Sequence, residues 1–480
     1  MEDKTMKKNL LLILAASAVI ASALSCQKIE QTVVPVDGNN VFELTVGASF
    51  GQPDTRALTE DGNVLSATFA TTENIYAYNA TTSTMLGGSL NPQSDGASAV
   101  LQGTLTGTIN NGDNLRLIYL KNAIDYSSQD GTLSGIAAGF DYATADVTVN
   151  EVSTPTVTTS PAKFVPQQSI TKFTFSTPVK TVTISGAGLV QSVTSTGEET
   201  TGNVTVTLDS PSATVYVALR NSSTDKVSYV FDATDGDGKT YQGSKKATLA
   251  AAKNYATSVA LHEYVDLGLA AKWATCNVGA NTPTELGEYH AWGETETYYE
   301  GEALPCIDPE AGIEPPMTWK TNKPGGYVWA SYKFGVYNSS AADKGFSKYN
   351  SNDGLLVMEP VDDAAAVLWG GSWRIPEMAD INDLKNNCTF VWKEDYNGSG
   401  VAGYLCTSKK NNNSIFLPAS GFLIRRDGIR QLNAQGYYWT ATLQTNLYRG
   451  RTMKFTATAT PALSYNDRYY GLIIRPVIKE

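Results

Sequence analysis

The chain contains the stretch Lys226-Val227-Ser228-Tyr229-Val230-Phe231, followed by Asp235-Gly236-Asp237-Gly238 and then Lys239-Thr240-Tyr241. Two β-prone runs around a glycine-rich turn predict a β-hairpin. Similar short runs, separated by turn residues, lie at 41–46, 114–120, 172–175, 179–184, 204–208 and 213–219. This spacing predicts β-sandwiches. The length suits two of them, which we expect at residues 27–160 and 161–262, with a join near 155–166.

The composition changes near residue 262. All eight tryptophans lie after this point, from Trp273 to Trp439, with four of the five cysteines. A different core is therefore expected over residues 263–480. Helices are predicted at 359–369 and from Pro376-Glu377 onward, the second with Met378, Ile381, Leu384 and Lys385 on one buried face. With core strands at 414–418 and 471–477, the sequence predicts an α+β domain. The fold class is mainly β overall.

Charge and composition exclude several functional classes. The 480 residues carry a net charge of −11, which argues against a nucleic-acid partner. Only His262 and His290 could serve a histidine-based metal site or a Ser-His-Asp triad. We therefore expect neither metal nor cofactor.

The N-terminus predicts export. Lys7 and Lys8 precede an apolar run over residues 10–20, and small residues then lead to Ala23-Leu24-Ser25-Cys26. Residues 1–26 are therefore predicted to form a signal peptide, and its end, residues 23–26, resembles the lipobox of bacterial lipoproteins. That resemblance implies acylation of Cys26 and a lipid-anchored protein at the outer membrane and cell surface. The alternative is an ordinary signal peptide with a chance cysteine.

The remaining cysteines are Cys276, Cys306, Cys388 and Cys406. An even number of cysteines in an exported chain predicts two disulfides. Four cysteines allow three connectivities, and spacing alone does not choose among them.

Several motifs in residues 27–262 resemble the fimbrillin family of surface pilins. They are Thr55-Arg56-Ala57, Asn74-Ile75-Tyr76-Ala77-Tyr78, Gln102-Gly103-Thr104-Leu105 and Ala252-Lys253-Asn254-Tyr255. The resemblance implies cleavage after Arg56, removal of an N-terminal strand, and strand donation between pilus subunits. We expect the run at 472–477 to be buried, leaving only residues 478–480 free. Such a chain would accept a strand without donating one and would stand at a pilus tip.

Motifs after residue 262 resemble the Fibrobacter succinogenes major paralogous domain family, which is similar to the formylglycine-generating-enzyme branch of the C-type lectin fold. They include Trp273-Ala274-Thr275-Cys276, Ala291-Trp292-Gly293-Glu294, Trp369-Gly370-Gly371-Ser372-Trp373-Arg374-Ile375-Pro376 and Gly436-Tyr437-Tyr438-Trp439. Because Cys276 and Cys388 both lie in family motifs, the resemblance implies that they pair, which leaves Cys306 for Cys406.

Catalysis is not expected. Glu294, Asp362 and Asp363 are the candidate carboxylates, but no nucleophile–base pair can be named. Asp362 and Asp363 are adjacent at a predicted helix start, where charge at the helix N-terminus explains them. Arg374 and Arg475 are interpreted as donors to loop carbonyls.

Residues near the end of the chain predict a ligand-binding surface. Tyrosine, arginine and asparagine on loops provide rigid aromatic area with adaptable polar contacts. The predicted surface consists of Tyr448, Arg449, Arg451, Tyr465, Asn466, Arg468 and Tyr469. An ordinary solvated surface is the alternative. The leading hypothesis is a tip or adhesive pilus subunit that binds a glycan or protein on host or bacterial surfaces. The other is a non-polymerising outer-membrane lipoprotein that displays the same domain.

Overall fold

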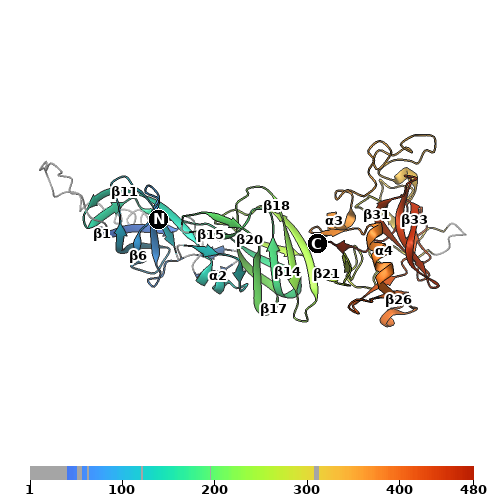
Figure 1. Ribbon diagram of the computed structural model, residues 1–480, viewed down its shortest axis with the longest axis horizontal. Helices are drawn as coiled ribbons and strands as arrows, with labels where there is room; N and C mark the ends of the chain where they lie inside the picture. The colour runs from blue at the N-terminus through green and yellow to red at the C-terminus, as the bar shows by residue number, and fades with distance from the viewer. Residues whose placement is uncertain are drawn as a thin grey trace, which may run out of the picture. The chain divides into compact units, whose positions relative to one another are not determined.

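The computed structural model describes residues 40–50, 57–61, 64–66, 68–119, 123–194, 196–306 and 313–479. Strands dominate its regular structure (Figure 1), which confirms the mainly-β prediction. Among the described residues, the buried apolar side chains form three clusters. Within the described residues, no helix is both long and apolar enough to cross a membrane.

The first sheet closes on itself. Its strand order is β12-β1-β13-β11-β8-β4-β6-β7, and a further pairing of β7 with β1 closes the ring of strands. The strands are β1 (Asn40–Phe50), β4 (Ile75–Asn79), β6 (Gly87–Pro92), β7 (Ser98–Gly107), β8 (Asn114–Tyr119), β11 (Ala143–Ser153), β12 (Thr156–Thr159) and β13 (Ala162–Pro166). The short β5 (Thr84–Met85) pairs with β4, while β2 (Ala57–Asp61) and β3 (Val64–Ser66) pair with each other.

Strand β1 is an integral part of this sheet. Phe42, Leu44, Val46 and Ala48 are buried, and the residues between them are exposed. This period of two places one face of the strand against the core. The strand pairs in parallel with β12 and β13 on one side and also pairs with β7.

The second sheet is built around two long strands, β14 (Ser169–Ser185) and β17 (Val204–Asn221), and β14 lies between β17 and β18 (Figure 1). Each long strand joins two of the predicted runs across a register shift. The predicted hairpin is confirmed as β18 (Val227–Thr234) and β19 (Thr240–Ala247). The sheet also contains β15 (Leu189–Val193), β16 (Glu199–Thr201) and β20 (Asn254–Val259).

The predicted boundary at 160/161 does not separate these two cores. Strand β13, which follows that boundary, belongs to the first sheet. Conversely, Tyr126 and Ile136 pack in the second core. They lie in or near β9 (Ile124–Asp125), β10 (Ser128–Gln129) and α2 (Leu133–Gly139), and β9 and β10 pair with second-sheet strands. The chain therefore enters the second core, returns to the first sheet, and crosses again at 167–168.

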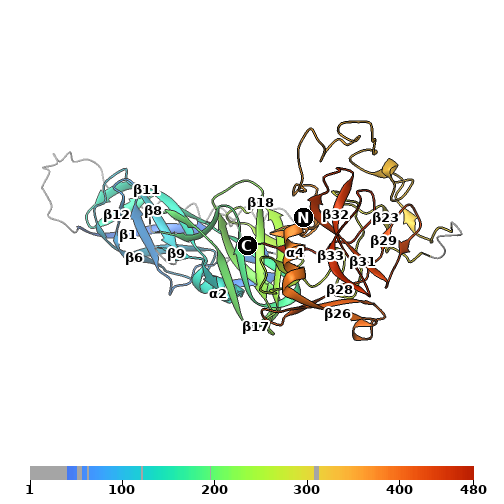
Figure 2. The ribbon, with the colours of Figure 1, turned by 45° about the vertical axis from the view of Figure 1, so that its right-hand side comes forward.

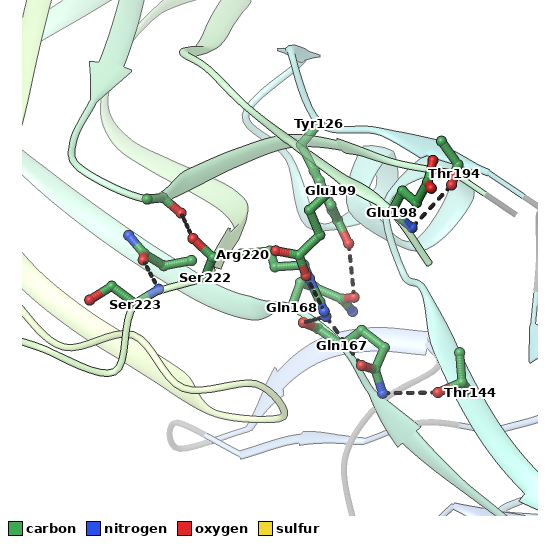
Figure 3. A network of polar contacts seen from close by, with 12 residues as sticks. Tyr126, Thr144, Gln167, Gln168, Thr194, Glu198, Glu199, Arg220, Ser222 and Ser223 are labelled. Carbon is green, nitrogen blue, oxygen red and sulfur yellow. Dashed lines mark hydrogen bonds and ion pairs between the residues drawn. The ribbon is translucent and has the colours of Figure 1, made fainter. Parts of the chain in front are cut away.

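Polar side chains hold this crossing in place (Figure 3). Arg220 donates to the carbonyl oxygen of Gln167 at 2.7 Å and pairs with Glu199 at 2.5 Å. The Gln167 amide donates to Thr144 of the first sheet at 3.0 Å. Next to it, buried Gln168 donates to Asp141 at 3.0 Å. Because these bonds connect strands of both sheets, they fix the direction of the chain between them.

The second sheet continues into the C-terminal part. Strand β21 (His262–Val265) pairs with β19 and with β22 (Lys272–Ala274), and the order then runs through β34 (Val477–Ile478) to β25 (Trp373–Arg374). The predicted boundary at 262/263 therefore lies inside β21. The His262 ring stacks on Trp369 with centroids 3.8 Å apart. Gly370 lies against Ser244 of β19. Its φ is 66°, and a Cβ there would lie 2.0 Å from Ser244 Oγ, so the close approach of residue 370 to Ser244 requires glycine.

The C-terminal part contains two three-stranded sheets, and Figures 1 and 2 place α4 (Met378–Asn387) beside the one formed by β31, β32 and β33. These strands are β31 (Gln435–Leu443), β32 (Arg449–Thr456) and β33 (Ala459–Asp467). The other sheet has β26 (Cys388–Lys393), β27 (Gly403–Ser408) and β28 (Ser414–Pro418). Shorter elements are β23 (Tyr299–Glu300), β24 (Thr318–Trp319), β29 (Phe422–Leu423), β30 (Ile429–Arg430), η1 (Trp329–Ser331) and η2 (Tyr396–Gly398).

The helix predictions hold in outline. The first helix is shorter than predicted, with α3 at Ala364–Leu368. In α4, Ile381 and Leu384 are buried as expected, whereas Lys385 is exposed. Asp380 is buried instead, because it caps the helix and pairs with Arg374 at 2.7 Å.

The C-terminal run is buried, as predicted. Leu472, Ile473, Ile474 and Val477 are at most 1% exposed. Isolated bridges, rather than a continuous strand, hold residues 471–473. Ile478 belongs to β34 and is 4% exposed, so the prediction that residue 478 is free is wrong.

Candidate ligand-binding surface

Most of the predicted ligand-binding residues lie at one end of the β32–β33 hairpin. Arg449 on β32 is opposite Asp467 on β33, and Arg451 is opposite Tyr465. Residues two apart on a strand share a face, so these four side chains lie on the same face of the sheet. Asn466 faces Gly450 on the opposite side.

The Arg449 guanidinium lies between two tyrosine rings. Its central carbon is 4.8 Å from the centroid of Tyr448 and 4.7 Å from that of Tyr465. Its Nε donates to Asp467 Oδ1 at 2.9 Å. The hydrogen bond to Asp467 raises the pKa of Arg449, so the guanidinium stays charged close to both rings.

A third ring extends this stack. Tyr337 lies 4.4 Å from Tyr448, and Tyr465 is 46% exposed. We call Tyr337, Tyr448, Arg449 and Tyr465 the Tyr–Arg ladder. Sequence reasoning missed Tyr337, because it lies in a distant loop and only the fold brings it to Tyr448. The ladder presents rigid aromatic area with a fixed positive charge.

Three polar atoms near the Tyr–Arg ladder have no hydrogen-bond partner among the described residues. They are Arg451 Nε, Gln444 Oε1 and Asn446 Oδ1, and all of them are buried. All three lie on β32 or on the loop that leads into it. Leaving such groups unpaired is costly, so a ligand that supplied partners would gain affinity there.

The prediction for Arg468 is wrong. Its side chain is fully buried, with the guanidinium 4.3 Å from the Phe346 ring. It donates to the Tyr332 hydroxyl and to the backbone carbonyls of residues 348, 349 and 447 at 3.0–3.3 Å. Arg468 therefore ties three loops together inside the core instead of meeting a ligand.

The remaining predicted residues are half-buried. Tyr469 packs against Trp329, with ring centroids 4.7 Å apart, and continues to Tyr470 at 5.0 Å. Asn466 accepts a bond from Thr452 at 3.5 Å. Tyr469 thus belongs to an aromatic surface next to the ladder and is not on the hairpin itself.

The candidate carboxylates all have structural partners. Glu294 is buried, accepts from the Tyr298 hydroxyl, and pairs with Lys323 at 2.8 Å. Asp362 pairs with Lys333 at 2.8 Å and Lys348 at 2.5 Å. Although burial acts to raise it, these hydrogen bonds lower the pKa of Asp362.

Asp363 is the N-cap of α3, as its position at a predicted helix start suggested. Its carboxylate accepts from the backbone N–H groups of Ala366 and Ile375 at 3.0 and 2.8 Å. Burial nevertheless raises the pKa of Asp363 to about 6. Arg475 behaves as predicted, since it donates to the carbonyls of Ala274 and Thr275.

The cysteines do not form the expected pairs. Cys276, Cys388 and Cys406 are free thiols in the structure, so neither the 276–388 nor the 306–406 bond is present. Strand register places Cys388 opposite Ser408, which makes Cys406 its diagonal neighbour on the same face. Burial raises the pKa of Cys388 to about 11 and also raises that of Cys406. Disulfide pairing stays a prediction.

Two predicted sites, Cys26 and Arg56, lie outside the described residues. Within the part of the chain that is described, no group of three histidine, cysteine, aspartate or glutamate residues is placed to hold a metal ion.

No protein-family model matches the chain, and no curated protein matches its sequence. Among solved structures, the chain is similar to a Bacteroides uniformis protein assigned to cell adhesion, with 15% identity, coverage of 48% of this chain and 98% of the other, and a TM-score of 0.28. A fimbrial assembly protein from Parabacteroides distasonis has 10% identity and a TM-score of 0.26, and the match covers 47% of this chain and 95% of the other. A Bacteroides eggerthii protein assigned to cell adhesion has 12% identity and a TM-score of 0.25, and the match covers 47% of this chain and 87% of the other. At these identities and TM-scores the similarity carries no argument about function.

Proposed function

We propose that this protein is a non-catalytic adhesion subunit at the cell surface, and that it binds its ligand through the Tyr–Arg ladder. The observation that carries the proposal is the ladder itself. Arg449 is fixed between two rings, one of them 46% exposed, beside buried polar atoms that lack partners. Rigid aromatic area with adaptable polar groups is the chemistry of recognition surfaces.

Assembly into a pilus is part of the proposal. Cleavage after Arg56 would release β1, which pairs on both of its sides. Its loss would expose the apolar positions now covered by Phe42, Leu44, Val46 and Ala48. A strand donated by a neighbouring subunit would restore both the main-chain hydrogen bonds and the core.

The final strand region supports a place at the pilus tip. Strand β34 pairs with β22 and β25, and the apolar residues before it are buried. Withdrawing this run for donation would expose each of its large apolar side chains at about 1.5–3 kcal/mol. We therefore propose that the chain accepts a strand and keeps residues 472–478 in its own core.

The absence of catalysis also belongs to the proposal. Glu294, Asp362 and Asp363 are engaged in ion pairs or a helix cap. Burial raises the pKa of the Cys276 thiol, which leaves it protonated and poorly nucleophilic.

Binding is tested with the purified full chain on a glycan array and by pull-down from surface extracts. We expect Arg449→Ala with Tyr465→Ala to abolish capture. The matched control is Arg116→Ala, because Arg116 forms the same kind of cross-strand pair, with Asp146 at 2.8 Å, in the first sheet. Equal capture by both variants would refute the ladder as the binding surface.

Assembly is tested by immunogold labelling and by sequencing the mature N-terminus. Label at pilus ends, with Ala57 as the first residue, is expected. Label along the shafts would refute the tip position. A mature protein that begins at Cys26 and labels no pilus would favour a lipoprotein that displays the same domain without polymerising. Cys26→Ala should leave the precursor unlipidated, and unchanged lipid labelling of that variant would refute the anchor.

A further inference from the structure

We propose that the Tyr–Arg ladder is one end of an aromatic belt that binds an extended anionic polysaccharide. This inference rests on the proposed function and names the ligand class of the same surface. The belt consists of the ladder and a chain of further rings, Trp329, Tyr469, Tyr470 and Phe422.

The first link joins the ladder to the adjoining aromatic surface. Trp329, in η1, lies 6.1 Å from Tyr337 and 4.7 Å from Tyr469. The Trp329 ring also packs on the core, since it lies 5.4 Å from the ring of buried Phe346. Trp329 therefore bridges the loop that carries Tyr337 and the segment that follows β33.

The second link carries the belt away from the hairpin. Tyr469 and Tyr470 lie 5.0 Å apart, and Tyr470 lies 5.6 Å from Phe422 in β29. Phe422 ends the belt against Tyr437, at 5.1 Å. Every contact between neighbouring rings is within the range of aromatic pairs.

The belt rings are neither in the core nor free on the surface. Trp329, Tyr337, Tyr448, Tyr469, Tyr470 and Phe422 are all half-buried and pack against the C-terminal core. Packing holds each ring in place while leaving part of it to solvent. Pre-ordered rings lose little entropy on binding, and their apolar faces match the C–H faces of sugar rings. A row of such rings suits a ligand with a row of sugars, which is a polysaccharide.

Positive charge follows the belt. Arg449 and Arg451 lie at the ladder end, and Lys454 lies 4.9 Å from the Tyr437 ring at the other. Exposed Arg425 acts electrostatically on Tyr469 between them. Asp467 is the acid paired with Arg449. In a chain whose net charge is −11, this surplus of cations favours an anionic ligand.

Single-stranded nucleic acid is also anionic and stacks on aromatic rings. It carries a charge on every phosphate and would meet the net negative charge of the chain at many positions. A polymer of uronic acids likewise carries one charge on each unit, so charge density does not separate the two ligands. The cell-surface role proposed above favours the polysaccharide, and single-stranded DNA is one outcome of the test.

The test measures binding of short and long oligogalacturonates to the purified full chain by calorimetry. Because the belt has two ends, affinity should rise about tenfold or more from the short to the long probe. A double variant at the far end, Tyr470→Ala with Phe422→Ala, should remove this gain. Tyr396→Ala is the matched control. Tyr396 is not a belt residue, and its ring stacks on that of Phe416 with centroids 4.0 Å apart.

The outcomes separate this inference from the proposed function. If the far-end variant keeps the full gain, or if no anionic probe binds, the belt is refuted. Capture in the array that still depends on Arg449 would then leave the adhesion proposal standing. Tighter binding of a neutral glucan of equal length, or of single-stranded DNA, would refute the anionic polysaccharide. Loss of binding in Tyr396→Ala would likewise overturn the assignment to the belt.

Discussion

The first sheet and the C-terminal part satisfy their backbone hydrogen-bonding groups in different ways. In the first sheet, strands satisfy one another's backbone groups, and apolar residues alternate along each strand, as in β1. In the C-terminal part, long side chains satisfy backbone groups across great sequence distances. Arg475 reaches Thr275, and Trp439 reaches His290. A sheet tolerates changes to individual polar side chains, whereas a loop-rich core depends on a few of them.

The tryptophans allow this contrast to be measured. All eight lie between Trp273 and Trp439, so their fluorescence follows unfolding of the C-terminal part. Far-ultraviolet circular dichroism follows the strands of all three cores. Comparing the two signals in a denaturant titration reveals which part a substitution destabilises.

The largest effect is expected from Arg468→Met. The substitution leaves the Tyr332 hydroxyl and the carbonyls at 348, 349 and 447 without their donor. Unsatisfied buried groups should reduce the free energy of unfolding by about 3–5 kcal/mol, seen as an earlier fluorescence transition. Arg451→Met, in the same hairpin, is the control and should shift it little. Equal shifts would contradict a structural role for Arg468.

In the first sheet the corresponding change is Leu117→Ala. Leu117 is fully buried in β8 among apolar neighbours. Loss of its side chain leaves a cavity and should cost about 2–5 kcal/mol. The dichroism transition should move while the fluorescence transition stays in place. A matching fluorescence shift would mean that the two cores unfold as one unit.

The contrast also explains what the sequence could predict. Alternation in 41–46 predicted β1, because a sheet encodes its buried face locally. Arg475 was assigned correctly from its place beside a proline in an apolar motif. Arg468 was not, because its neighbours have the composition of an exposed loop. What buries it is Phe346, Tyr332 and Tyr349, which lie over a hundred residues earlier.

The domain boundaries failed for a related reason. Composition placed a boundary at 262, yet β21 spans it and pairs on both sides. Likewise, Tyr126 lies within the sequence of the first sheet and packs in the second core. Strand partners are set by tertiary contacts, and a single sequence holds no record of them.

A pH titration probes the connection between the second sheet and the C-terminal part. Burial against Trp369 lowers the pKa of His262 to about 4, below the value near 6.5 expected when unfolded. The unfolded chain therefore binds this proton first, and stability falls as pH drops from about 6.5 to about 4, by up to about 3 kcal/mol. His262→Phe keeps a ring on Trp369 and should flatten this dependence. An unchanged pH profile in the variant would contradict burial of a neutral His262.

The smallest effect on stability is expected from Arg449→Gln, and it sharpens the comparison most. Arg449 begins β32 and Arg468 directly follows β33, at the same end of the hairpin, yet one lies between partly exposed rings and the other lies in the core. An exposed cation–π contact and an exposed ion pair each contribute about 1 kcal/mol or less, so the fluorescence transition should barely move. Ligand capture should nevertheless fall, because the ring-held charge is lost. Reduced capture with intact stability would separate a recognition arginine from a structural one on a single hairpin. A loss of stability as large as that of Arg468→Met would show that the ladder holds the fold together instead.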